Sequence, residues 1–178
     1  MISKRAQVEL VGLVIIVILI TLGMLFLVLF ALQGDSEKDV FTRKGLAYST
    51  MGALVKTNIQ CENGVVSYPQ LGNGLLDDCA QALRGGVDFC YYKCGPEHCC
   101  DFSQKQIKTL LEESLGLWGK HYVFTSTLVR FGGGSTNELF SPIIGNGGCT
   151  GKNKDSSGVF PITAEGTGLI ENVLYVCD

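Results

Sequence analysis

The sequence predicts an α+β protein in which a long N-terminal transmembrane and assembly helix precedes a small disulfide-bonded α+β head with an antiparallel sheet. Three observations lead to this fold class. The chain is 46% hydrophobic, but much of its apolar content lies in one block near the N-terminus. All eight cysteines follow that block. The C-terminal part combines one clear helical segment with several β-rich segments joined by short glycine-containing turns, an order typical of a helix packed on a small sheet.

The apolar block is long enough to cross a membrane. From Leu10 to Leu32 it has no charged residue, and 18 of its 23 positions are Leu, Ile, Val or Phe. About 20 helical residues span a bilayer core, and each such side chain favours insertion by roughly 0.3–0.6 kcal/mol. A cleaved secretory signal peptide usually has an apolar region of about 7–15 residues followed by a small-residue cleavage site. No convincing site follows this run, so residues 7–33 are expected to form a transmembrane helix.

Charge predicts the orientation of that helix. Lys4 and Arg5 lie in the leader, residues 1–6, which should therefore remain cytoplasmic while the C-terminal domain lies outside. All but two of the 14 basic residues and all but one of the 17 acidic residues follow Leu32, so that part has a net charge of −4. Nucleic-acid binding requires a clustered basic patch. We therefore expect a single-pass cell-membrane protein with no nucleic-acid partner.

Residues 34–60 are expected to extend the helix as a stalk. Apolar residues recur near one stripe at helical spacing, while charged and polar residues occupy much of the remaining surface. The apolar stripe comprises Val40, Phe41, Ala47, Met51, Leu54 and Val55, and the polar positions include Lys38, Asp39, Arg43, Lys44 and Thr50. Because no proline separates this segment from the membrane run, one nearly continuous helix is expected. Its amphipathic half should pack on the C-terminal part.

Residues 61–178 form the expected extracytoplasmic head. We predict a turn and short strand in ENGVVSYPQ, a short helix in GLLDDCAQAL, a strand in GGVDFCYYKC and a turn in GPEHCCD. Ser103 and Gln106 have capping-box spacing, and a stripe from Ile107 to Trp118 predicts the main helix, with Gly119 as its stop. Strands are predicted in HYVFTSTLVRF, GVFPI and GLIENVLYVC, and loops in GGGSTN and GNGG.

The cysteines predict disulfides. An even number in a small extracytoplasmic domain is typical of a disulfide framework, although eight cysteines allow 105 pairings. The segment CYYKCGPEHCC also offers Cys and His ligands for zinc, but adjacent Cys99 and Cys100 point in different directions on an extended chain. Disulfides are the favoured interpretation, and no metal or cofactor is expected. The predicted disulfide residues are Cys61, Cys79, Cys90, Cys94, Cys99, Cys100, Cys149 and Cys177.

Catalytic patterns are weak, and the chain is predicted not to be an enzyme. The two histidines, His98 and His121, are expected to be surface or locally bonded side chains. FGGGSTN lacks the Gly-Lys-Ser/Thr ending of a phosphate loop. The acidic pairs Asp77–Asp78 and Glu112–Glu113 diverge by about 100° on a helix, so solvated helix faces are expected there.

Three residues at the junction between leader and apolar run are not required for membrane insertion: Ala6, Gln7 and Glu9. From Ser3 to Gln33 the sequence resembles the class III signal peptide of archaeal type IV pilin-like proteins, in which a basic leader ends in a small residue followed by Gln, a nearby Glu and a long apolar helix. The resemblance implies that a prepilin-type peptidase cuts between Ala6 and Gln7. It also implies that the helix then self-associates, or associates with related pilin-like subunits, in a filament core. Glu9 would assist assembly, although it would be the third residue after the cut, whereas pilins often place it fifth.

An uncleaved anchor is the principal alternative. In that case the chain is a single-pass, signal-anchored surface protein whose disulfide-rich ectodomain binds a ligand or another cell. An extracytoplasmic enzyme or redox protein is a third, weaker interpretation. The first two alternatives differ in the state of the Ala6–Gln7 peptide bond.

Overall fold

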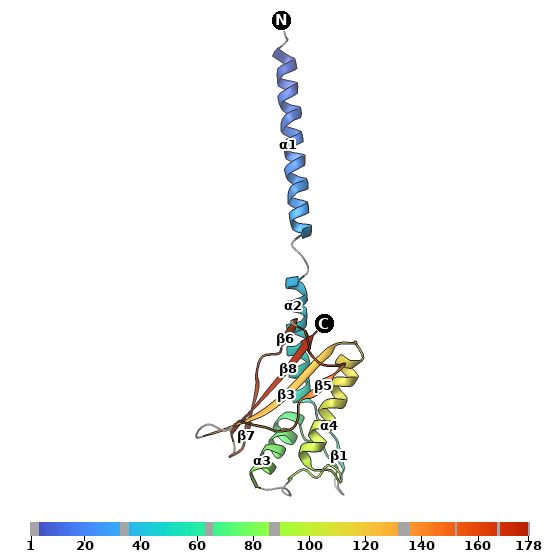
Figure 1. The fold of residues 1–178 in the computed structure, drawn as a ribbon, viewed down its shortest axis with the longest axis vertical. Coiled ribbons are helices and arrows are strands. Elements are labelled where there is room, and N and C mark those ends of the chain that lie inside the picture. The colour runs from blue at the N-terminus through green and yellow to red at the C-terminus, as the bar shows by residue number, and fades with distance from the viewer. Residues whose placement is uncertain are drawn as a thin grey trace. The chain divides into compact units, whose positions relative to one another are not determined.

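The structure is a computed structural model that describes residues 4–32, 36–62, 66–85, 90–131, 136–151, 153–166 and 168–177. It contains two compact units, Met1–Asp39 and Val40–Asp178. The first consists mainly of a helix, and the second is the α+β head (Figure 1). The predicted fold class is confirmed as an N-terminal apolar helix followed by an α+β region with an antiparallel sheet.

All described helices precede Gly119, and all described strands except β1 and β2 follow it. The helical elements are α1 (Lys4–Leu32), α2 (Ser36–Lys56), the π-helical turn η1 (Leu71–Leu76), α3 (Asp77–Gly85), α4 (Cys99–Leu111) and the π-helical turn η2 (Glu112–Gly116). The strands are β1 (Cys61–Glu62), β2 (Val66–Ser67), β3 (His121–Arg130), β4 (Thr136–Glu138), β5 (Ile143–Gly145), β6 (Lys154–Ser156), β7 (Phe160–Ala164) and β8 (Gly168–Cys177).

Helix α1 is apolar around its whole circumference. Its segment Gly12–Phe30 has a mean hydropathy of 3.3, and none of its residues is buried within the protein. A helix that is hydrophobic on every side requires lipid or other helices around it. By length and composition α1 is therefore a candidate membrane span. The junction of the nearly continuous helix predicted from sequence, residues 33–35, lies outside the described residues.

Helix α2 has two different faces from Val40 onward. Ala47, Met51 and Leu54 are buried in the head core, at 0%, 0% and 5% exposure. Phe41, predicted in the same stripe, is instead 81% exposed. Arg43, predicted among the polar positions, lies on the buried face at 7% exposure. The i, i+4 spacing of Arg43 and Ala47 places both on one side of the helix.

The main sheet is built around two long antiparallel strands. Strands β3 and β8 pair along their full lengths, from His121 opposite Cys177 to Arg130 opposite Gly168. The sheet order is β4-β3-β8-β6, with β5 on β3 and β7 on β8, while β1 and β2 form a separate hairpin. Alternate residues of β3 and β8 are buried, which places one sheet face against the core.

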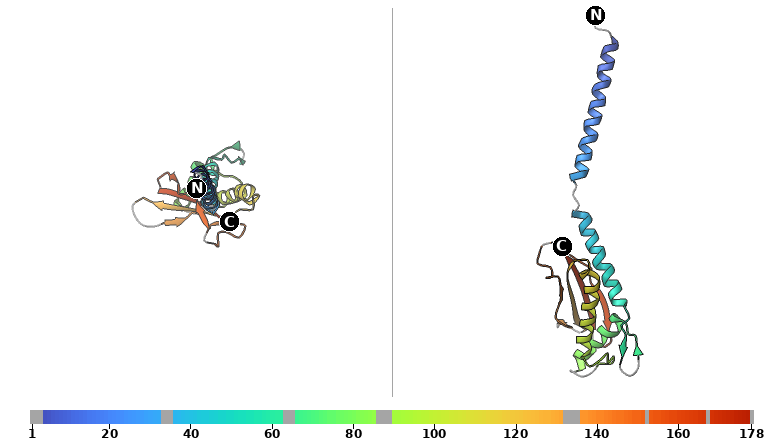
Figure 2. Two further views of the ribbon diagram at one scale, coloured as in Figure 1. Left: turned by 90° about the horizontal axis from the view of Figure 1, so that it is seen from above. Right: turned by 90° about the vertical axis from the view of Figure 1, so that its right-hand side faces the viewer.

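Helices α2, α3 and α4 gather against this sheet (Figures 1 and 2). Leu75, Ile107, Leu111 and Leu174 are fully buried in one hydrophobic cluster that also includes residues of α2. The approach of β5 to β3 requires a glycine, because a Cβ at Gly145 would overlap the Tyr122 ring. The cluster thus joins the elements of the head into one core.

Most predicted head elements are present, with boundaries that differ. Strands β3, β7 and β8 and the helix at α3 confirm the predictions for those segments. The main helix begins at Cys99 rather than after Ser103, and its N-cap is His98. Ser103 is instead internal, and its hydroxyl bonds to the carbonyl of Cys99 at 2.7 Å. Trp118, expected to continue the buried stripe, is 66% exposed.

The strand predicted in GGVDFCYYKC is wrong for the residues that the structure describes. Residues 86–89 lie outside them, and Cys90–Cys94 has no strand pairing. The backbone N–H groups of Tyr91 and Tyr92 donate to the Asp78 carboxylate instead of to a neighbouring strand. Side-chain acceptors that satisfy the backbone in this way compete with sheet formation.

Candidate functional site

The residues of the predicted processing site lie at the start of α1. The helix begins at Lys4 and therefore includes Arg5, Ala6, Gln7 and Glu9. The side chains of residues 4–11 lie outside the described part of the chain. Their roles in topology, cleavage and assembly stay predictions.

All eight cysteines are joined in disulfides, which confirms the predicted framework. The pairs are Cys61–Cys94, Cys79–Cys100, Cys90–Cys99 and Cys149–Cys177. Their sequence separations are 33, 21, 9 and 28 residues. Three of the four bridges meet between Cys61 and Cys100, where they connect β1, α3, α4 and the segment Cys90–Cys94. The fourth ties the segment after β5 to the end of β8.

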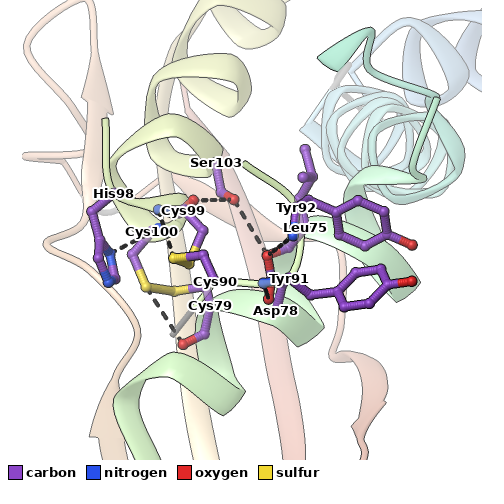
Figure 3. The surroundings of a disulfide bond; sticks show 10 residues. All are labelled: Leu75, Asp78, Cys79, Cys90, Tyr91, Tyr92, His98, Cys99, Cys100 and Ser103. Carbon is purple, nitrogen blue, oxygen red and sulfur yellow. Dashed lines mark hydrogen bonds between the residues drawn. A yellow bond between two sulfur atoms is a disulfide. The ribbon is translucent and has the colours of Figure 1, made fainter. Parts of the chain in front are cut away.

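The N-terminus of α4 carries the densest group of polar and sulfur-containing side chains (Figure 3). His98 caps the helix, because its Nδ1 accepts the backbone N–H of Cys100 at 3.3 Å. The backbone N–H of Cys99 donates to the Sγ of Cys90 at 3.2 Å. These N–H groups belong to the first helical turn, where no carbonyl of the helix itself is available. Side chains of Cys90 and His98 thus satisfy helix donors that would otherwise lack partners.

Asp78 holds the segment that follows α3. Its Oδ1 accepts the N–H of Tyr91 at 2.7 Å and its Oδ2 accepts the N–H of Tyr92 at 2.9 Å. The carboxylate is 4% exposed, and this burial raises the pKa of Asp78 above its ordinary value. The two N–H groups act in the opposite direction and favour the charged form. The expectation of a solvated face is therefore wrong for Asp78, which is a structural acceptor.

Asp77 also has a structural role. Its carboxylate accepts the backbone N–H of Glu165 at 3.0 Å and the side-chain amide of Gln81 at 3.0 Å. Asp77 therefore connects α3 to the turn after β7. By contrast, Glu112 and Glu113 are exposed as predicted. The sequence did not distinguish the two acidic pairs, because the backbone N–H groups that Asp77 and Asp78 accept belong to residues 13 to 88 positions away.

Three side chains have the proximity of a metal site. Ligand atoms of Cys90, His98 and Cys99 all lie within 4.8 Å of one another. However, the two sulfur atoms are bonded to each other, and a disulfide offers no thiolate to a metal. His98 Nε2 is buried and has no hydrogen-bond partner among the described residues. In the oxidised chain this arrangement is therefore a disulfide beside an imidazole.

A buried ion pair was missed by sequence reasoning. Arg43 on α2 donates through Nε to the Asp155 carboxylate of β6 at 2.7 Å, and their side chains are 9% and 11% exposed. The two residues are 112 positions apart, so no local spacing identifies them. The available signal was the position of Arg43 four residues before Ala47, on the apolar side of the helix.

Two of the open grooves on the described part of the head lie beside α4. The larger, of about 470 Å³, runs between α4 and β5 and is lined by Gln104, Lys105, Lys108 and Ile144, among others. The smaller, of about 220 Å³, lies between α2 and the α4–η2 segment and is lined mainly by Ala53, Leu54 and Leu110. Lys105 and Lys108 already pair with Glu97 and Glu112. Neither groove brings together a nucleophile and a base among the described residues.

Tyr122 is a further buried polar group. Its hydroxyl has no hydrogen-bond partner in the described part of the chain, and its side chain is 1% exposed. Burial raises the pKa of Tyr122, and the negative charge of Glu112 adds to this effect. A tyrosine with these properties stays neutral at physiological pH and acts as a core side chain.

Comparison with known proteins identifies no relative. No family model matches the chain, and neither a curated protein nor a solved structure matches it.

Proposed function

We propose that this chain is a pilin-like surface subunit, inserted with its N-terminus in the cytoplasm and its disulfide-bonded head outside the cell membrane. The observation that carries the proposal is helix α1, whose segment Gly12–Phe30 is apolar on every side and has no buried residue within the protein. Such a surface is stable only in lipid or against other helices. A subunit that moves from the membrane into a helix-packed filament meets both conditions in turn.

The head supports the same proposal. An amphipathic helix, α2, packs on an antiparallel sheet, and four disulfides stabilise the unit. Disulfides persist in oxidising surroundings such as the cell surface. The N-terminal residues Lys4 to Glu9 add the order of a basic pair, a small residue, Gln and Glu that the resemblance associates with cleavage and assembly.

The mature N-terminus tests the cleavage step. Full-length protein is expressed in a host that carries a prepilin-type peptidase, and the membrane and surface fractions are analysed by intact-mass and N-terminal peptide measurement. We expect a chain that begins at Gln7. Ala6→Asp should abolish the cut, whereas the control Ala6→Gly, which keeps a small residue, should retain it. An intact leader in the wild-type protein would contradict cleavage and favour the uncleaved surface anchor.

Assembly is tested separately from cleavage. Sheared cell-surface material is sedimented, and the chain is detected in the pellet after crosslinking. Cleaved wild-type protein should form crosslinked multimers, and Glu9→Gln should reduce them without preventing the cut. If cleaved protein remains monomeric in the membrane, the filament part of the proposal fails while the processing part stands.

A further inference from the structure

We propose that the Cys90–Cys99 bridge is a thiol–disulfide exchange site that reacts with an external dithiol while the other three disulfides hold the fold. Four properties of this bridge support the proposal: its loop length, its accessibility, the groups around its sulfur atoms and the redundancy of its connections. The proposal concerns the head and does not depend on cleavage or filament assembly.

Loop length makes this bridge the one whose opening should cost the fold least. Its cysteines are 9 residues apart, compared with 21, 28 and 33 for the other pairs. A disulfide stabilises a protein mainly by restricting the unfolded chain, and this effect increases with loop length. Reduction of Cys90–Cys99 is therefore expected to destabilise the head less than reduction of any other bridge.

Accessibility decides which sulfur is attacked. Cys90 is partly exposed, whereas Cys99 is 3% exposed. An external thiolate therefore attacks Cys90 Sγ, the Cys90–Cys99 bond breaks, and its electron pair leaves on Cys99 Sγ, which takes up a proton. In the mixed disulfide, the second thiol of the dithiol then attacks the dithiol sulfur that is bonded to Cys90, and Cys90 leaves as a thiolate. The dithiol is oxidised by two electrons, and the bridge is reduced by two.

The surroundings of Cys90 favour that leaving group. Its Sγ already accepts the N–H of Cys99 at 3.2 Å, in the first turn of a 13-residue helix. A helix N-terminus stabilises a cysteine thiolate through its N–H groups and its dipole. A ring nitrogen of His98 also lies within 4.8 Å of both sulfur atoms. A stabilised thiolate leaves faster and makes the disulfide easier to reduce.

Neighbouring contacts hold both ends of the bridge in place when it opens (Figure 3). The α4 end is fixed by Cys79–Cys100, immediately beside Cys99. On the other side, Tyr91 and Tyr92 are fixed by Asp78, and Cys94 is joined to Cys61. The two thiols therefore remain close after reduction and can reoxidise to the same pair.

Graded reduction of the full-length, detergent-solubilised protein tests the proposal. The protein is equilibrated with dithiothreitol buffers of increasing reducing strength and alkylated, and each cysteine is quantified by peptide mass spectrometry. We expect Cys90 and Cys99 to be alkylated together at a lower ratio of reduced to oxidised dithiothreitol than the other six cysteines, with the near-UV circular dichroism of the head retained. Simultaneous opening of several bridges, or earlier opening of another pair, would overturn the proposal.

Single-cysteine variants test the order of attack. In Cys99→Ser, the remaining Cys90 thiol is expected to form a mixed disulfide with oxidised glutathione. The matched variant Cys90→Ser leaves Cys99 buried and should react at least tenfold more slowly. Equal rates would overturn the assignment of Cys90 as the reacting sulfur. If either variant fails to fold, the graded reduction of the wild-type protein still decides the proposal.

Discussion

Helices α1 and α2 follow one another in the chain but have opposite relations to the rest of the protein. Every residue of α1 from Gly12 to Phe30 is exposed, and the segment contains no charge. Helix α2 alternates exposed and buried positions and places Met51 at 0% exposure in the head core. The difference shows that a long helix acquires its environment from its pattern of side chains: α1 requires apolar surroundings supplied from outside, whereas α2 has its partner in the same chain.

The largest expected effect is on membrane insertion of α1, when two lysines are introduced into it. Ile18→Lys with Leu22→Lys is expected to make membrane insertion less favourable by roughly 5–7 kcal/mol, because each lysine near the centre of a span costs about 2.5–3.5 kcal/mol. Protease protection of the head in microsomes measures the inserted fraction. The matched substitution Tyr48→Lys on the exposed side of α2 should leave insertion unchanged. Normal insertion of the double variant would show that α1 is not a membrane span.

Breaking the buried ion pair should have the next largest effect, on the stability of the head. Arg43→Met leaves the Asp155 carboxylate buried without its partner at 2.7 Å and is expected to lower the free energy of unfolding by about 3–5 kcal/mol. Urea unfolding followed by near-UV circular dichroism measures the change. Lys44→Met, the exposed neighbour, should change stability by less than about 0.5 kcal/mol. The double variant Arg43→Met with Asp155→Leu should recover much of the loss.

Truncation of one apolar side chain in each helix compares the contributions of α1 and α2 to the stability of the head. Met51→Ala is expected to destabilise the head by about 2–5 kcal/mol, since the side chain is fully buried and its removal leaves a cavity. Leu25→Ala in α1 removes a side chain that is 57% exposed and should leave head unfolding unchanged. Urea unfolding followed by near-UV circular dichroism measures the stability of both variants. An equal effect of the two substitutions would mean that α1 contributes to the folding of the head.

The parts of the fold that sequence could predict are those governed by local periodicity. The apolar run of α1 and the alternating strands β3 and β8 carry their pattern over ten or more residues. The short strands β4, β5 and β6 have three residues each, which is too short for a period to be recognised. Their positions depend on pairing with β3 or β8 rather than on their own sequence.

The candidate sites also divide into features that the sequence predicts and features that depend on long-range contacts. The presence of disulfides followed from cysteine number and compartment, but the pairing of Cys90 with Cys99 depends on where His98 begins α4. The sequence favoured Ser103 as the cap because its spacing from Gln106 matched a capping box. Asp78 was assigned to solvent because its acceptor role requires the return of Tyr91 and Tyr92 to α3. Long-range contacts of this kind leave no periodic signal.

The smallest expected effect concerns pH and tests whether the head is held together at Asp78. Burial raises the pKa of Asp78 above 3.8 in the folded protein, although the N–H groups of Tyr91 and Tyr92 act in the opposite direction. Asp77 raises this pKa and His98 lowers it, both by less. The folded state therefore holds this proton more tightly than the unfolded chain. The corresponding stability is fully present below pH 3.8 and is lost as the pH rises through the folded pKa.

Asp78→Asn removes this titration, and comparison with the wild type isolates it. Asn accepts through one oxygen, so one of the N–H groups of Tyr91 and Tyr92 loses its acceptor, and a constant loss of about 1–3 kcal/mol is expected. On top of that constant, the stability of the wild type relative to the variant should decrease as the pH rises from 3 towards neutrality. Urea unfolding of both proteins across this range measures the difference, in which the contributions of other carboxyl groups cancel. A difference independent of pH would mean that Asp78 is equally easy to ionise in both states, and that the paired N–H groups fully offset its burial.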